Sequence, residues 1–142
     1  MKFISFRIFV VATFVFLANC SFAQTPILSE VKATLVPEFV NGSPYLSIKI
    51  KAPDWKVGNI LHIEVLKEES TVLMMTLATV SEDNGVKVVY LSTSEKKFNI
   101  INGTAAIEVP IDETQQKFAK SLSVFMWDFS GQKSSNVNCE IK

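Results

Sequence analysis

The chain contains a single histidine, His62, which is the first residue to consider for catalysis. Histidine transfers protons near neutral pH and is the commonest metal ligand, but common catalytic zinc sites use two or three of them. A Ser-His-Asp arrangement remains open because serines and aspartates are plentiful, yet the sequence has no Gly-x-Ser-x-Gly turn to present a serine nucleophile. We therefore expect no catalytic residue, and a small secreted hydrolase is the weakest functional hypothesis.

Carboxylates occur as adjacent pairs at 68–69, 82–83 and 112–113. Glycosidases need two carboxylates that face each other across a cleft, and neighbours on one turn do not have that geometry. The oxygen donors of 82–84 suit calcium by type, but they lack the alternating ligand spacing of a calcium loop. The sequence therefore predicts solvated turns at these positions, with no metal and no cofactor.

Aromatic residues are the clearest candidate binding groups. Trp55 follows Pro-Asp in a loop segment, where it is either exposed for binding or buried as a plug. Phe125 and Trp127 alternate with other bulky apolar residues, so this pair is either packed under a loop or forms a docking surface. We take Trp55, Phe125 and Trp127 as the candidate binding surface. Tyr45 and Tyr90 are further rings that a sugar-binding platform would use.

Short strands must hold these residues in place. In 45–51, Leu46, Ile48 and Ile50 alternate with polar residues in the period-2 pattern of a half-buried strand. Turn signals such as Asn84-Gly85, which favours a tight hairpin, separate similar segments. The expected strands span 28–36, 45–51, 60–68, 71–80, 86–93, 98–101, 104–109 and two segments within 121–142.

Two segments depart from simple alternation. Residues 71–80 are nearly all apolar, which predicts a central strand covered on both faces, although periodicity leaves an amphipathic helix open. Residues 112–120 suit about one helical turn. The spacing of strands and turns otherwise predicts one all-β domain.

The end of the chain, 121–142, is patterned as a β-hairpin that turns at 130–133. Its residues follow the pattern apolar-x-apolar-x-Asp-x-x-Gly-x-x-Ser at Val124, Met126, Asp128, Gly131 and Ser134. This pattern resembles the last two strands of bacterial immunoglobulin-like and fibronectin type III-like domains. The resemblance implies an immunoglobulin-like sandwich of seven to eight antiparallel strands, in which 112–120 crosses between the sheets. The Cys…Trp…Cys signature of true immunoglobulin domains is absent, so the resemblance implies an architecture and no activity.

The start of the chain has the pattern of a secretory signal peptide at 1–23. Lys2 and Arg7 precede a short apolar run, which is too short to span a bilayer, and Ser-Phe-Ala ends the segment. We therefore expect a single β-sandwich domain at 24–142, without a transmembrane segment. Leu-Ala-Asn-Cys is similar to a bacterial lipobox, which makes Cys20 a candidate for lipidation, although that pattern wants a small residue where Asn19 stands. If the leader is cleaved after Ala23, Cys20 leaves with it and Cys139 is the only thiol. Cys139 alternates with apolar residues, which predicts a buried structural role.

Charge excludes one class of partner. The chain has 14 basic and 14 acidic residues, and loss of Lys2 and Arg7 leaves 12 lysines against 14 acidic residues, a net charge of 12 − 14 = −2 without arginine. Nucleic-acid recognition relies on a basic surface and on arginine, so we expect no nucleic-acid partner.

The favoured function is an exported, non-catalytic binding or structural domain that acts as a protein-interaction or envelope accessory module. It would be secreted, periplasmic or at the bacterial cell surface. The alternative is a carbohydrate-binding module that stacks exposed aromatic rings on sugars.

Overall fold

The computed structural model describes residues 25–37, 42–68 and 71–142. The expected leader 1–23 and Cys20 lie outside the described residues. Within them the chain forms nine strands and one short helix, which confirms the all-β prediction, with nine strands where the resemblance to a sandwich implied seven or eight. The elements are β1 (Glu30–Val36), β2 (Tyr45–Lys51), β3 (Ile60–Glu68), β4 (Thr71–Asp83), β5 (Val86–Leu91), β6 (Lys97–Ile101), β7 (Thr104–Pro110), α2 (Glu113–Phe118), β8 (Ser121–Trp127) and β9 (Val137–Glu140).

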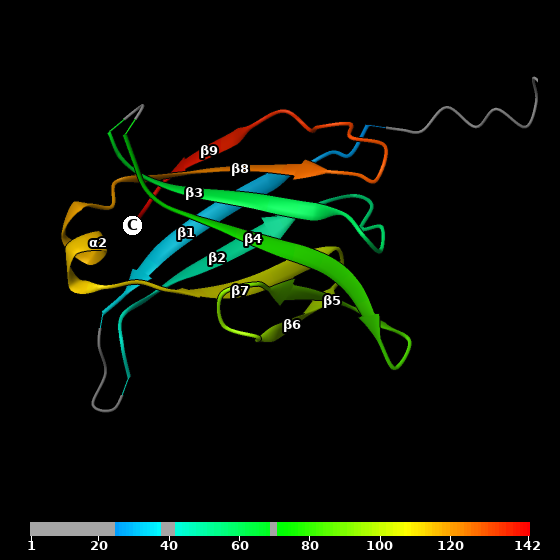
Figure 1. Ribbon diagram of the computed structural model, residues 1–142, viewed down its shortest axis with the longest axis horizontal. Coiled ribbons are helices and arrows are strands. Elements are labelled where there is room, and N and C mark those ends of the chain that lie inside the picture. The colour runs from blue at the N-terminus through cyan, green and yellow to red at the C-terminus, as the bar shows by residue number, and fades with distance from the viewer. Residues whose placement is uncertain (1–24, 38–41, 69–70) are drawn as a thin grey trace, which may run out of the picture.

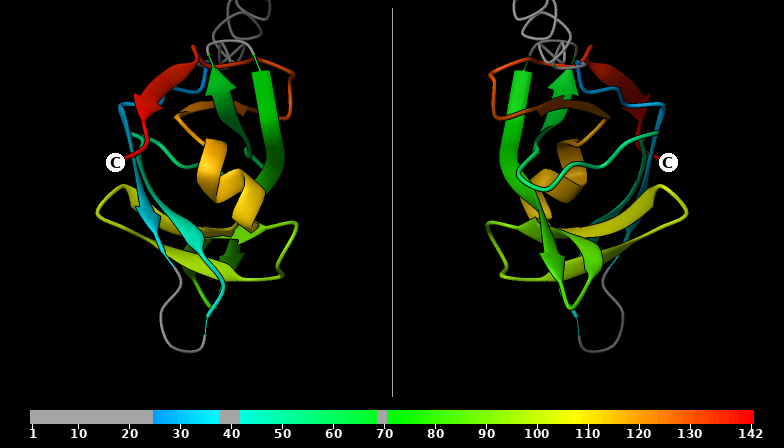
Figure 2. Two further views of the ribbon diagram at one scale, coloured as in Figure 1. Left: turned by 90° about the vertical axis from the view of Figure 1, so that its left-hand side faces the viewer. Right: turned by 90° about the vertical axis from the view of Figure 1, so that its right-hand side faces the viewer.

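All nine strands belong to one antiparallel sheet, in the order β1-β2-β7-β6-β5-β4-β3-β8-β9. The sheet curls so that its first and last strands approach each other (Figure 1, Figure 2). Ala33, in β1, forms an isolated parallel bridge with Ile141. The backbone N–H of Leu35 also donates to the carbonyl of Lys142 at 2.8 Å. The sheet is therefore nearly closed into a barrel.

Two hairpins turn at Asn-Gly pairs. Asn84 and Gly85 have φ values of 50° and 79°, and Asn102 and Gly103 have 50° and 74°. Asparagine and glycine accept these left-handed angles at low cost, and two such residues in a row match the twist of the flanking strands. The prediction of a tight turn at Asn84-Gly85 is confirmed.

Alternation along the strands builds the core. In β2, Leu46, Ile48 and Ile50 are fully buried, as the period-2 pattern predicts, and β3 and β7 follow the same rule. Because the sheet curls, strands from both halves of it contribute side chains to one interior. The largest fully buried side chains are Leu46, Ile48, Ile50, Leu61, Ile63, Leu91, Ile107, Leu122 and Met126.

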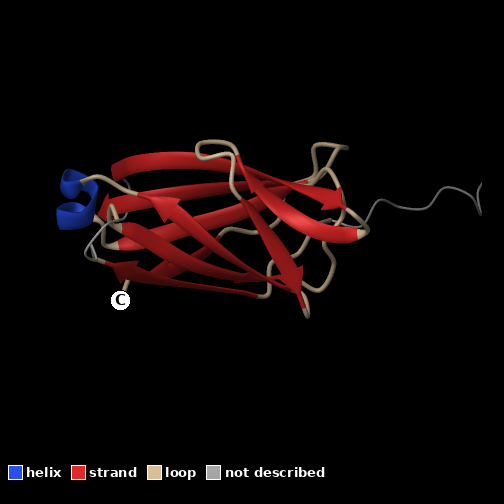
Figure 3. Ribbon diagram, turned by 90° about the horizontal axis from the view of Figure 1, so that it is seen from below, coloured by secondary structure: helices blue, strands red, loops and turns tan. Residues whose placement is uncertain are grey.

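The helix α2 carries the chain from β7 to β8 at one end of the molecule (Figure 3). Asp112 accepts a hydrogen bond from the backbone N–H of Gln115, and the Gln115 side chain accepts one from the backbone of Asp112. This reciprocal capping box stabilises the first turn of a helix that has no buried residue. The predicted helical turn at 112–120 is confirmed.

Strand β4 differs from the prediction of a strand covered on both faces. It is a strand and not a helix, but its burial alternates: Thr76, Ala78 and Val80 face the core, while Met75 and Leu77 face solvent. The inward residues at 76 and 78 are small, and the large ones point outward. An apolar strand therefore presents apolar side chains on the outside of the sheet.

Cys139 lies on β9 at the seam between β9 and β1. Its side chain packs against the core, but it is half-buried where full burial was predicted, and it is a free thiol. Burial raises the pKa of this thiol, and the backbone N–H of Ala33 only partly offsets the effect by hydrogen bonding to the sulfur. The thiolate, which is the reactive form, is therefore disfavoured.

We expect Cys139 to react with a disulfide reagent at pH 8 more slowly in the folded protein than in the protein unfolded in guanidinium. The measurement is the rate of thiol release in the two states, with a short cysteine peptide as the reference. A folded-state rate equal to that of the peptide would contradict the burial of this thiol.

Candidate functional site

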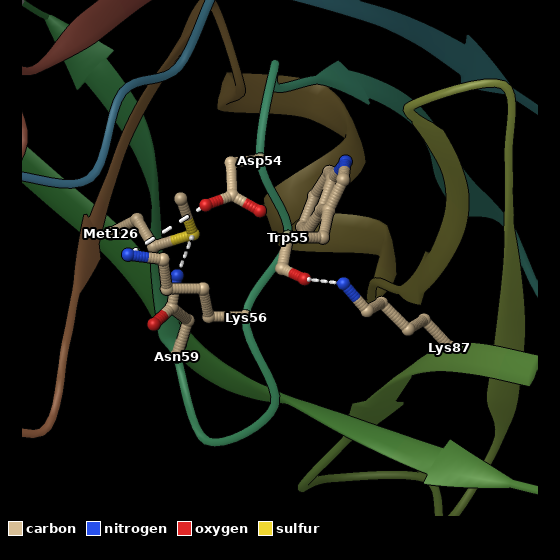
Figure 4. A network of polar contacts seen from close by, with 6 residues as sticks. All are labelled: Asp54, Trp55, Lys56, Asn59, Lys87 and Met126. Atoms are coloured by element: carbon tan, nitrogen blue, oxygen red, sulfur yellow. Dashed lines mark hydrogen bonds and ion pairs between the residues drawn. The ribbon is translucent and has the colours of Figure 1, made fainter.

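Trp55 is buried and does not belong to a binding surface. Its side chain is 4% exposed, and its indole N–H donates to the backbone carbonyl of Gly103 at 2.9 Å. The Nζ atom of Lys87 donates to the backbone carbonyl of Trp55, which holds the backbone of the loop in place at this residue (Figure 4). The residue plugs the core beneath the β2–β3 loop, so the candidate surface loses Trp55.

Phe125 and Trp127 point outward from β8, on the side away from the core. Register places His62 of β3 directly beside Phe125, and Leu77 of β4 beside His62. Met75 precedes Leu77 by two residues in β4, so its side chain lies on the same side of the sheet. We call the side formed by Met75, Leu77, His62, Phe125 and Trp127 the outer face.

Three rings form a cluster on the outer face. The rings of His62 and Phe125 lie 4.4 Å apart between centroids, and those of Phe125 and Trp127 lie 5.2 Å apart at 64°. The Nε2 atom of His62 is 3.3 Å from Glu64 Oε1, but neither ring nitrogen of His62 forms a well-aligned hydrogen bond within the described part of the chain. The histidine therefore packs as an aromatic ring in this cluster, and no hydrogen bond joins it to a serine or an aspartate among the described residues.

Phe125 is only 5% exposed because its neighbours cover it. The Lys133 ammonium, from the β8–β9 turn, lies 3.8 Å from the centre of the Phe125 ring, a cation–π contact. Phe125 therefore packs beneath its neighbours His62 and Trp127, and a partner can reach Trp127 but not Phe125. Of the three candidate residues, one is accessible.

The accessible part of the outer face is largely aliphatic. Met75 is 56% exposed, Leu77 37% and Trp127 36%. Sequence reasoning missed Met75 and Leu77 because it treated 71–80 as covered on both faces. Large and small residues alternate over 75–78 of β4, but this size pattern alone does not say which of the two sets is covered.

The other aromatic and acidic candidates lie apart. Tyr45 in β2 and Tyr90 in β5 are half-buried on different strands. Asp83 pairs with Lys97 at 2.9 Å, so this carboxylate is used in a surface ion pair. Across residues 25–37, 42–68 and 71–142, no group of three histidine, cysteine or acidic side chains is arranged to hold a metal ion.

Comparison of the chain with protein-family models, with curated proteins and with solved structures gave no match. None of the helices that the structure describes is long and apolar enough to cross a lipid bilayer.

Proposed function

We propose that the chain is an exported, non-catalytic protein-binding domain with an immunoglobulin-like fold that contacts its partner through the outer face. Export rests on the leader pattern at 1–23 and directs the domain to the periplasm or the bacterial cell surface. Acylation at Cys20 would hold it on the membrane.

The strand order supports the immunoglobulin-like assignment. The order β1-β2-β7-β6 follows that of strands A-B-E-D in such domains, and β5-β4-β3-β8-β9 follows C″-C′-C-F-G of the variable type. The helix α2 lies between β7 and β8, where an immunoglobulin-like chain crosses from one sheet to the other. The main difference is that β5 and β6 pair, which joins the two layers into one sheet.

The observation that carries the protein-binding function is that Met75, Leu77 and Trp127 are exposed apolar side chains on one face of a regular sheet. Met75 and Leu77 lie on β4 and Trp127 lies on β8, with β3 between the two strands, and burying all three against a partner would remove apolar area from water. Methionine and tryptophan are enriched at protein interfaces.

Sugar binding is less well supported by the same surface. A stacking platform needs exposed, coplanar rings, but Trp127 is set edge-on to Phe125, and Phe125 is buried. The other exposed residues of the outer face, Met75 and Leu77 on β4, carry flexible chains without a ring, and these offer a protein more than they offer a sugar ring.

The test is co-purification after cross-linking in the envelope of the native cell, comparing the wild type with Leu77→Asp. A charge at the centre of an apolar interface costs about 2 kcal/mol, so the recovery of a face-dependent partner should fall about 30-fold. Leu77 points to solvent, so the variant should melt at the wild-type temperature.

The matched control is Ile101→Asp, which places the same charge on another exposed apolar residue, 65% exposed in β6. This variant should recover the partner as well as the wild type does. Equal recovery with Leu77→Asp, or an equal loss in both variants, would exclude the outer face as the docking surface.

A further inference from the structure

A cavity opens at the end of the molecule away from α2, between the N-terminal segment, the β2–β3 loop and the β8–β9 turn. Its volume is about 270 Å³, which suits one compact chemical group. Pro26, Ile27 and Pro53 supply apolar walls. Such walls favour an apolar group over a hydrated one, since they offer no hydrogen bonds to replace those of water.

The cavity is also lined by a buried amide. Asn59 is 2% exposed, and its Nδ2 atom donates to the sulfur of Met126 at 3.5 Å, which is a weak acceptor (Figure 4). The side-chain oxygen of this amide is an acceptor by its chemistry, so it suits a ligand that offers a donor.

Charges at the rim favour a cation. Lys56 lies 3.7 Å from Asp54, on the same side of the loop as Asn59 (Figure 4), and Asp128 lines the same cavity. Two carboxylates and one ammonium therefore line the cavity, which leaves a local charge of about −1.

Asp128 is held in position by its own turn. Its Oδ1 atom accepts the backbone N–H of Ser130 at 2.9 Å, the Ser130 hydroxyl at 2.7 Å and the backbone N–H of Gln132 at 2.9 Å. The Ser130 hydroxyl bond, above all, lowers the pKa of this carboxyl, so it is ionised at neutral pH. Its second oxygen remains available to a ligand.

An exposed aromatic ring stands beside the same rim. Phe129 follows Asp128 and is 85% exposed, and its ring occupies the space that a side chain at Gly58 would need. Gly58 has a φ of +91°, which favours glycine, so the backbone leaves room for the ring.

We infer that this cavity is a binding site for a compact apolar group that carries a protonated amine. The apolar part would lie against Pro26, Ile27 and Pro53. The ammonium would meet Asp128, with Asn59 as an acceptor. Two sources share this chemistry: a small hydrophobic amine, or the free amino terminus of a protein whose first residue is apolar. The site uses none of the outer-face residues and is independent of the proposed function.

The experiment is an NMR titration of the purified exported protein with 2-phenylethylammonium. Two ligands of similar apolar size serve as references: 2-phenylethanol, which is neutral, and 3-phenylpropionate, which is anionic. We expect saturable shifts of the amide signals of Gly58 and Asn59 with the ammonium, about tenfold weaker binding of the alcohol, and no saturation with the carboxylate. Equal binding of the ammonium and the carboxylate would overturn the inference, as would the absence of saturation with all three.

Asp128→Asn tests the rim directly, because its side-chain oxygen can still accept the bonds of the turn while the charge is removed. The Kd for the ammonium should rise about tenfold. Glu113→Gln, on α2 at the other end, removes one carboxylate elsewhere and should leave the Kd unchanged, as should Leu77→Asp on the outer face. An unchanged Kd in Asp128→Asn would overturn the inference.

A Phe-Gly-Gly amide with a free amino terminus distinguishes the two sources. Tighter binding than that of 2-phenylethylammonium, lost on acetylation, supports a protein amino terminus. Binding no tighter than that of the amine supports a small amine.

Discussion

Replacing Trp55 by alanine is expected to destabilise the protein by about 3–5 kcal/mol, because a large buried side chain is removed and its cavity cannot fully collapse. A domain of this size is stable by roughly 5–15 kcal/mol, so the variant should unfold at much lower denaturant concentration. The measurement is urea unfolding followed by circular dichroism, which does not depend on the lost indole.

Trp55→Phe is the matched control. Phenylalanine retains most of the apolar volume but loses the indole N–H that donates to Gly103, so the cost should be about 1–2 kcal/mol. If Trp55→Ala left stability within about 1 kcal/mol of the wild type, the ring would not be part of the core, and Trp55 would return as a binding residue.

Removal of residues 137–142 has the second large expected effect. Val137, Cys139 and Ile141 cover the core beside β8, and Lys142 joins the chain to β1 through two backbone hydrogen bonds. Their loss would expose Leu122 and Val124, which are fully buried.

We expect this truncation to cost about 5 kcal/mol or more, which approaches the total stability of such a domain. The shortened chain should lose its cooperative thermal transition and bind a dye that detects exposed apolar surface. Removing only Lys142 keeps the β8–β9 hairpin and Ile141, and should cost about 1–2 kcal/mol for the two lost backbone bonds. A cooperative melt of the 1–136 chain near that of the full chain would show that β9 does not seal the core.

The sequence determined most of the strands and turns, because both depend on local physics, although 82–83, which were expected in a turn, are the last two residues of β4. The alternation in 45–51 identified β2 and its buried residues, and Asn84-Gly85 identified a hairpin through the angles that these residues accept. The same holds for the hairpin at 121–142, which pairs Ser121 with Glu140 and Val124 with Val137. A capped helical turn at 112–120 followed from its own residues.

The faces of the apolar segments were beyond what the sequence determines. In 71–80 nearly every residue is apolar, so periodicity could not separate a strand covered on both sides from one exposed on one side. Which side of β4 is covered depends on the curl of the sheet, and therefore on contacts between residues far apart in the chain. The exposure of Met75 and Leu77 appeared only with that curl.

The candidate sites depended on tertiary structure in the same way. A tryptophan after Pro-Asp has the same local sequence whether its ring is buried or exposed, and only the carbonyl of Gly103, 48 residues away, decides for burial. Asp54, Asn59 and Asp128 meet at one cavity because the β2–β3 loop and the β8–β9 turn lie at the same end of the sheet. Sequence determined which residues are present and how each strand alternates, whereas the closing of the sheet decided which of them face a partner, a ligand or the core.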